Sequence, residues 1–80
     1  MDDTQLRTQV TEVFRDIFAL PGLEIRDEMT AGDVKGWDSL SHIDLILALE
    51  RRFKVKFTTG EVSKLKNVGD LLSLVRRKAK

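Results

Sequence analysis

Ser39 is the residue of this sequence best placed to take part in chemistry, because of the residues that precede it. Gly36 permits a sharp turn of the backbone and Asp38 is a favourable N-cap residue, so Gly36-Trp37-Asp38-Ser39-Leu40 predicts a helix that begins at Ser39. A helix start has unpaired N–H groups and the positive end of the helix dipole, which together favour a phosphate group. The Ser39 hydroxyl is therefore placed to become a phosphate ester, unless Asp38 and Ser39 serve only to cap the helix.

Asp38, Ser39 and His42 are also the residue types of a hydrolytic triad, and they lie within five positions. A triad histidine must contact the nucleophile with one ring nitrogen and the carboxylate with the other. Because Asp38 is used as the cap, we expect no catalysis here, and we expect His42 to lie on the surface. Trp37, beside the serine, is interpreted as a core anchor for the preceding loop rather than as a ligand-stacking residue.

The composition argues against an enzyme. The chain has no cysteine, which excludes a thiol nucleophile and a thiolate metal site, and it has one histidine. The loop carboxylates Asp27, Glu28 and Asp33 lack the spacing and the central glycine of a calcium-binding loop. We therefore expect no resident metal, and at most weak binding of divalent cations.

Length and hydropathy predict one small domain over residues 1–80, expected to be cytoplasmic. Hydrophobic residues make up 41% of the chain and charged residues 34%, which is typical of a soluble globular protein. The longest apolar run, residues 45–49, is too short to cross a membrane. Met1 is followed by two aspartates rather than by an apolar segment, so we expect no secretion signal.

The spacing of apolar residues and of capping residues predicts an all-α fold: a small four-helix bundle, with three main helices and one short one. The first helix is expected over about residues 4–20 and to be stopped by Pro21-Gly22, and the second over residues 39–53. A short helix, capped by Thr58, is expected to run through Leu65, and Asn67 is expected to cap the last helix. A long loop, about residues 23–37, separates the first two helices.

The predicted helix 39–53 carries more apolar surface than one buried face requires. One stripe consists of Leu45, Ile46, Leu49 and Phe53. The other stripe consists of Leu40, Ile43 and Leu47. We interpret the first stripe as the core face and the second as an exposed face that meets a partner, because an 80-residue chain has no large core.

Charge is distributed unevenly along the chain. Residues 1–50 contain 11 acidic and 4 basic side chains, whereas residues 51–80 contain 2 acidic and 10 basic ones. Such asymmetry is compatible with a small helical nucleic-acid-binding domain, with an unmodified protein-interaction module, or with attraction between the two halves. The basic side chains lack the admixture of Asn and Gln expected of a base-reading face. We therefore expect no nucleic-acid or membrane partner.

Several stretches resemble the acyl carrier proteins. Asp38-Ser39-Leu40 matches the motif at which these carriers bear 4′-phosphopantetheine. Residues 45–50, followed by Phe53, resemble the remainder of the family's second helix. The helix order, the long first loop and the short third helix agree as well, so the resemblance covers roughly residues 4–77.

The resemblance implies a function. A phosphopantetheinyl transferase would move 4′-phosphopantetheine from coenzyme A onto Ser39, between Asp38 and Leu40, and acyl-loading and acyl-processing enzymes would then use the cofactor thiol to carry thioesters. The family pattern implies that Leu40, Ile43 and Leu47 face partners. It implies that Asp38, Asp44 and Glu50 pair with partner cations. It also implies that Val62 lines the space between the second and third helices, and that the carrier is a monomer.

Two departures from the family pattern bear on the pathway. Ser41 stands where an acidic residue is common, and Arg51-Arg52 extend the second helix with positive charge. These features favour a specialised carrier, in polyketide, nonribosomal peptide or modified fatty acid synthesis, over the main fatty-acid carrier.

Overall fold

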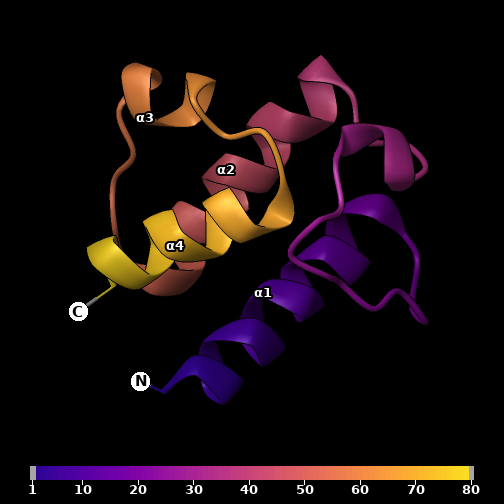
Figure 1. Cartoon of the computed structure of the whole chain (residues 1–80), viewed down its shortest axis with the longest axis horizontal. Helices are drawn as coiled ribbons and strands as arrows, with labels where there is room; N and C mark the ends of the chain where they lie inside the picture. The colour runs from indigo at the N-terminus through magenta and orange to yellow at the C-terminus, as the bar shows by residue number, and fades with distance from the viewer. Residues whose placement is uncertain (1, 80) are drawn as a thin grey trace.

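A computed structural model describes residues 2–79, and within this range it contains four α-helices, one 3-10 turn and no strand (Figure 1). The elements are α1 (Asp3–Phe18), η1 (Ala31–Asp33), α2 (Ser39–Phe53), α3 (Thr59–Ser63) and α4 (Val68–Lys78). The predicted all-α class is thus confirmed, with three longer helices and one short one. The predicted loop contains η1, which the sequence pattern did not indicate.

Each α-helix is preceded by a cap residue whose side chain accepts a hydrogen bond from a backbone N–H of the first turn. The cap residues are Asp2, Asp38, Thr58 and Asn67. Such caps satisfy N–H groups that have no partner within the helix. The predicted caps of the last three helices are therefore confirmed, and α2 has the predicted bounds.

The predicted ends of two helices were wrong. Helix α1 ends at Phe18 rather than Leu20, because Ala19 adopts the left-handed conformation (φ 53°) and its N–H donates to the Arg15 carbonyl. Pro21-Gly22 therefore lies beyond the C-cap and does not itself end the helix. Helix α3 ends at Ser63, so Leu65 lies just beyond it. Local C-cap geometry, rather than the apolar spacing, decides where these helices stop.

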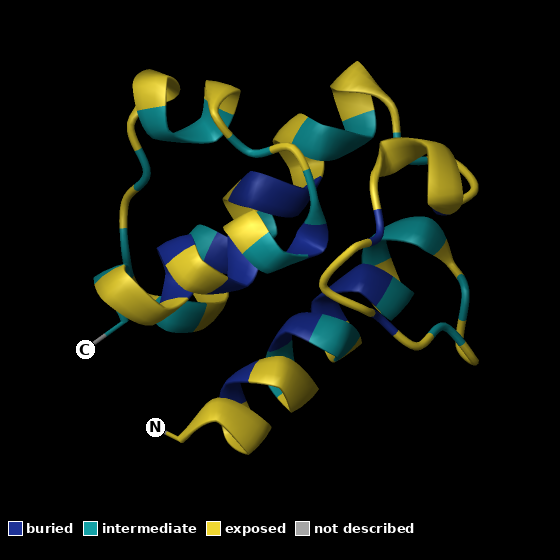
Figure 2. Ribbon diagram, viewed as in Figure 1, coloured by how far each residue is buried: buried dark blue, intermediate teal, exposed yellow. Residues whose placement is uncertain are grey.

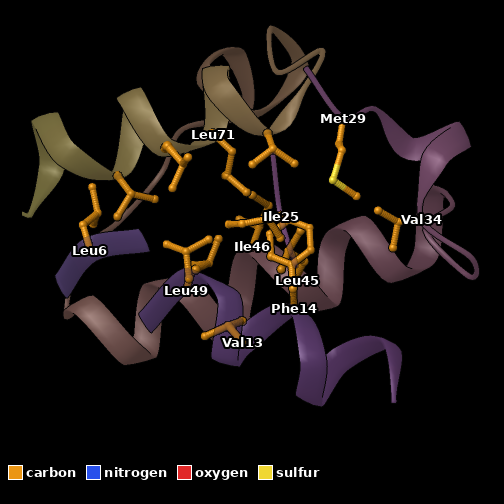
Figure 3. Packing of buried hydrophobic residues seen from close by; sticks show 14 residues of the cluster. Leu6, Val13, Phe14, Ile25, Met29, Val34, Leu45, Ile46, Leu49 and Leu71 are labelled. Carbon is orange, nitrogen blue, oxygen red and sulfur yellow. The ribbon is translucent and has the colours of Figure 1, made fainter. Parts of the chain in front are cut away.

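The core forms where α1, α2 and α4 meet and where the long loop covers one end (Figure 3). Helix α1 contributes Leu6, Val10, Val13 and Phe14, and α4 contributes Val68, Leu71, Leu72 and Val75. Helix α2 contributes Leu45, Ile46 and Leu49, and the loop contributes Ile25, Met29 and Val34. Phe53 is partly buried against this cluster. The predicted core face of α2 is thus the buried face.

The long loop is fastened to α4 and α1 by its backbone. The N–H groups of Val68 and Gly69 donate to the carbonyl oxygens of Met29 (2.8 Å) and Asp27 (2.9 Å). Arg15 Nε donates to the Leu23 carbonyl oxygen at 2.7 Å. A Cβ atom at Gly69 would lie 3.2 Å from Asp27, so glycine allows this close approach. The loop therefore holds the segment before α2 in a defined place.

The charge asymmetry is partly compensated within the fold. Arg52 on α2 pairs with Glu12 on α1. The start of α1 and the end of α4 lie at the same end of the molecule (Figure 1), where Arg76 Nε is 2.9 Å from Asp3 Oδ1. These two ion pairs join the basic second half to the acidic first half. Exposed pairs of this kind contribute about 0–1 kcal/mol each.

Helix α3 has five residues, and polar contacts to Glu61 hold its first turn. Thr58 and Glu61 form a reciprocal capping box, and Lys78 Nζ on α4 lies 3.0 Å from Glu61 Oε1. The hydrogen bond from the Thr58 backbone, followed by the contact with Lys78, holds the pKa of Glu61 below its ordinary value. These contacts stabilise an element too short to persist by itself.

Candidate functional site

The turn before α2 leaves the Ser39 side chain in solvent. Gly36 has a φ of 91°, a conformation that favours glycine. Asp38 is extended, and its Oδ1 atom accepts hydrogen bonds from the N–H groups of Leu40 (3.1 Å) and Ser41 (3.0 Å). Figure 2 shows the start of α2 in the exposed colour, and Ser39 is exposed. The predicted cap is therefore observed, and Ser39 is the first residue of the helix.

The two serines at this helix start have different surroundings. The Ser41 hydroxyl donates to the Gly36 carbonyl oxygen at 2.6 Å and lies 3.1 Å from Asp38 Oδ1. Within the described part of the chain, the Ser39 hydroxyl has no hydrogen-bond partner. Ser41 thus stabilises the turn, whereas the oxygen of Ser39 is available for reaction.

Asp38 stays ionised well into the acidic range. Hydrogen bonds from the Ser41 backbone and side chain, followed by the one from the Leu40 backbone, lower the pKa of Asp38. The negative charge at the positive end of α2 stabilises the helix start. Capping, rather than proton transfer, is therefore the role that the geometry gives this carboxylate.

The prediction that His42 lies on the surface was wrong. Its side chain is half-buried against Trp37. Its Nδ1 accepts a hydrogen bond from Trp37 Nε1 at 3.1 Å, and the two rings stack with centroids 6.0 Å apart. Burial lowers the pKa of His42, and the Val62 backbone acts in the opposite direction. A nitrogen that accepts from an indole N–H cannot at the same time activate Ser39, so the geometry differs from that of a triad.

Trp37 anchors the turn to the core, as predicted. Its ring makes an edge-to-face contact with Phe14, at a centroid distance of 5.3 Å, and a tilted contact with Phe18 at 6.1 Å. Aromatic pairs in such geometries contribute about 0.5–1.5 kcal/mol beyond the area they bury. Trp37 therefore connects the core of α1 to His42, three residues beyond Ser39.

A groove of about 480 Å³ lies beside Ser39. It is lined by Ala31, Trp37, Asp38, Ser39, His42, Leu65 and Lys66. Sequence reasoning missed Ala31, Leu65 and Lys66, because they are brought here only by the packing of the long loop and of the segment after α3. The groove would give a group attached at Ser39 a surface to rest on, with apolar walls, the Asp38 carboxylate and the Lys66 cation.

The second apolar stripe of α2 is exposed, as predicted. The exposed fractions of Leu40, Ile43 and Leu47 are 76%, 55% and 45%. Asp44 is exposed as well. Large apolar side chains gathered on one exposed face are typical of a protein–protein contact.

Glu50, expected to pair with partner cations, and Val62, expected to line the space between the second and third helices, both have contacts within the fold. Glu50 is half-buried, and its Oε2 accepts a hydrogen bond from the Phe57 N–H at 2.8 Å. Val62 is half-buried and packs against the core cluster, and it does not line the groove beside Ser39. Glu50 therefore organises the segment that follows α2.

The acids of the long loop are engaged with neighbours. Asp27 pairs with Arg7, Glu28 pairs with Arg26, and Asp33 accepts a hydrogen bond from the Thr30 N–H. Residues 2–79 contain no cluster of three or more metal-ligating side chains.

Comparisons with known proteins define the class of this chain. The family model described as "Phosphopantetheine attachment site" matches residues 8–75. The acyl carrier protein of Clostridium acetobutylicum is 31% identical over 68 residues, which cover 85% of this chain and 88% of that protein. The acyl carrier protein of Acidothermus cellulolyticus is 28% identical over 71 residues, covering 89% and 84% of the two chains.

A solved structure agrees with these matches. The holo acyl carrier protein of Geobacter metallireducens has 46% sequence identity and a TM-score of 0.85, covering 90% of this chain and 83% of that one. The chain belongs to the family of 4′-phosphopantetheine-dependent carriers, and within it to the acyl carrier proteins.

Family membership establishes the general function. The prosthetic group is 4′-phosphopantetheine, and the protein is an acyl carrier. Carriers of this family in general meet phosphopantetheinyl transferases and acyl-processing enzymes. The nucleic-acid-binding alternative receives no support from these matches. No helix within residues 2–79 has the length and hydropathy to span a bilayer.

Proposed function

We propose that Ser39 Oγ is the attachment point of 4′-phosphopantetheine. The observation that carries the proposal is an exposed serine hydroxyl without a hydrogen-bond partner in the described structure, on the first residue of a capped 15-residue helix. The N-terminus of such a helix stabilises a phosphodiester. Ser41 is a poorer candidate, because its hydroxyl is engaged with the Gly36 carbonyl oxygen. Asp38 and Leu40 flank the attachment point.

In this proposal the chain positions the attachment point at the start of α2, and the prosthetic group supplies a thiol that carries acyl groups as thioesters. The chain has no cysteine, so it adds no competing thiol. A transferase joins the phosphorus on the pantetheine side of the coenzyme A diphosphate to Ser39 Oγ, the diphosphate bond breaks, and adenosine 3′,5′-bisphosphate leaves. The hydroxyl proton passes to a base on the transferase. Asp38 maintains the helix start throughout.

We further propose that Leu40, Ile43 and Leu47 form the surface that partner enzymes contact. Their exposure supports this assignment. Asp44, on the same side of the helix, is proposed to pair with a partner cation. The proposed contribution of Glu50 is smaller, since one carboxylate oxygen is bound to Phe57. Val62 is proposed to contact the acyl group only if α3 moves, because it packs inward.

A specialised pathway is proposed on two features of α2. Ser41, where an acidic residue is common in the family, is used to fix the turn before the helix. Arg51 and Arg52 place positive charge at the other end of α2, and of the two only Arg52 is paired within residues 2–79, with Glu12, so Arg51 is the one that remains for a partner. A carrier with this charge pattern suits a few dedicated enzymes of polyketide, nonribosomal peptide or modified fatty acid assembly better than enzymes that recognise acidic carriers.

The experiment is modification of the wild type, Ser39→Ala and Ser41→Ala, the last being the matched control. Each protein is incubated with coenzyme A and a broad-specificity phosphopantetheinyl transferase, and its intact mass is recorded. We expect one phosphopantetheine on the wild type and on Ser41→Ala, and none on Ser39→Ala, with helical circular dichroism in all three. Modification of Ser39→Ala, or none of the wild type with several transferases, would contradict the proposal.

A further inference from the structure

The C-terminal end of α2 carries a groove with a basic rim. The groove has a volume of about 320 Å³ and is lined by Leu47, Glu50, Arg51, Lys54, Val55 and Lys56. The three cations are exposed, and none has an ion-pair partner within residues 2–79. The acid of this lining, Glu50, accepts the Phe57 N–H. The charge that the groove presents to a partner is therefore positive.

This basic rim continues the exposed apolar stripe of α2. Arg51 and Lys54 follow Leu47 by four and seven positions, a spacing that places residues on one face of a helix. The face thus begins with the exposed leucine and isoleucine side chains near Ser39 and ends in cations. Arg52 lies outside this surface, because it reaches Glu12 on α1.

Lys54 occupies a position where glycine is favoured. It is the C-cap of α2, with a φ of 57° in the left-handed region, and its N–H donates to the Glu50 carbonyl oxygen. Non-glycine residues are uncommon in this conformation, which costs roughly 1 kcal/mol relative to glycine. Lys54 thus keeps a cation at the end of α2 at a conformational cost that glycine would avoid.

We infer that this groove is a docking surface for a partner protein whose own surface presents carboxylates around an apolar side chain. The apolar side chain would contact Leu47 and Val55, and the carboxylates would pair with Arg51, Lys54 and Lys56. The inference rests on the proposed function only in taking this face of α2 as the docking face. It assigns the partner an acidic surface opposite the end of α2 that is remote from Ser39.

The test uses two designed amphipathic helical peptides as probes. One has a leucine ridge flanked by glutamates, and the other has lysine at each glutamate position. Backbone amide chemical shifts of the full-length protein are followed during titration with each peptide. We expect the glutamate peptide to shift residues 47–56 and to bind less tightly as salt is added, and we expect the lysine peptide not to bind there.

Charge reversal with a matched control locates the surface. The variant Arg51→Glu/Lys54→Glu/Lys56→Glu is expected to weaken binding of the glutamate peptide by about tenfold or more. The control Lys35→Glu/Lys64→Glu/Arg77→Glu makes the same change of charge at three other exposed cations. We expect this control to change the affinity less than about twofold, because it leaves the groove intact.

The variant Lys54→Gly separates docking from a purely structural role. Glycine relieves the left-handed conformation, so the melting temperature should stay the same or rise. Binding of the glutamate peptide should weaken severalfold. If Lys54 only offset the negative end of the helix dipole, stability would fall and binding would be unchanged, which would overturn the inference.

Three other outcomes would overturn the inference: shifts confined to α4, no response to the glutamate peptide, or tighter binding to anionic lipid vesicles or duplex DNA than to this peptide. The test uses the unmodified chain and so does not depend on Ser39. A failure of attachment would show in the intact mass of the wild type, whereas a failure of docking shows in these titrations.

Discussion

The two faces of α2 have almost the same apolar side chains and opposite environments. Leu49 is completely buried, whereas Leu47, two positions away, has an exposed fraction of 45%. Residue type does not separate them, since both are leucines in the middle of one helix. The difference comes from α1 and α4, which cover one face and leave the other (Figures 2 and 3). One face of the helix stabilises the fold, and the other is available for recognition.

The largest expected effect separates the two leucines. Leu49→Ala leaves a cavity in the core and should lower the free energy of unfolding by about 2–5 kcal/mol. Leu47→Ala should lower it much less, because the side chain is already half in water. Urea denaturation followed by circular dichroism measures both values. A larger loss of stability for Leu47→Ala than for Leu49→Ala would contradict the assignment of Leu49 to the core and of Leu47 to the exposed face.

A smaller effect separates the two neighbouring arginines. Arg52→Glu replaces an ion pair with a repulsion from Glu12 and should cost about 1 kcal/mol at low salt. Arg51 has no ion-pair partner within residues 2–79, so Arg51→Glu should hardly change the melting temperature. Added salt should reduce the difference between the two variants. Equal losses that persist at high salt would contradict the assignment of Arg52 to the fold and Arg51 to the surface.

The smallest expected effect concerns His42, which is half-buried against Trp37. Burial lowers the pKa of His42 in the folded protein, so the unfolded chain takes up a proton more readily. Its contribution to stability is therefore full above about pH 6.5 and is lost as the pH falls through the lower folded-state value. Protonation of Nδ1 also removes the acceptor of the Trp37 N–H.

His42→Gln is the control for this effect, because glutamine does not titrate in this range. Melting temperatures between about pH 7 and pH 5 should fall more for the wild type than for the variant. Trp37, the single tryptophan, should report the same transition by its fluorescence. Identical pH profiles would show that the contact with His42 adds no stability.

Local signals predicted much of the fold and the start of the site. Asp38, Thr58 and Asn67 act on the turn that follows each of them, and the sequence alone identified all three as caps. The spacing of Leu45 and Leu49 likewise oriented α2, because helical periodicity is a local property. The predicted end of α1 was wrong because the C-cap residue in the left-handed conformation is Ala19. Glycine is the residue type that usually marks such a C-cap, and here it is absent from that position.

The sequence by itself determined which hydroxyl follows a capped helix start and which stripes α2 carries, since both depend on neighbours within a few positions. It also determined how unevenly charge is distributed, since that needs only a count along the chain. Only the tertiary structure decided that His42 is covered by Trp37, that Lys66 joins the groove beside Ser39, and that Arg52 is paired while Arg51 is not. These outcomes depend on contacts between segments far apart in the chain, where burial and pairing are set by how the helices pack.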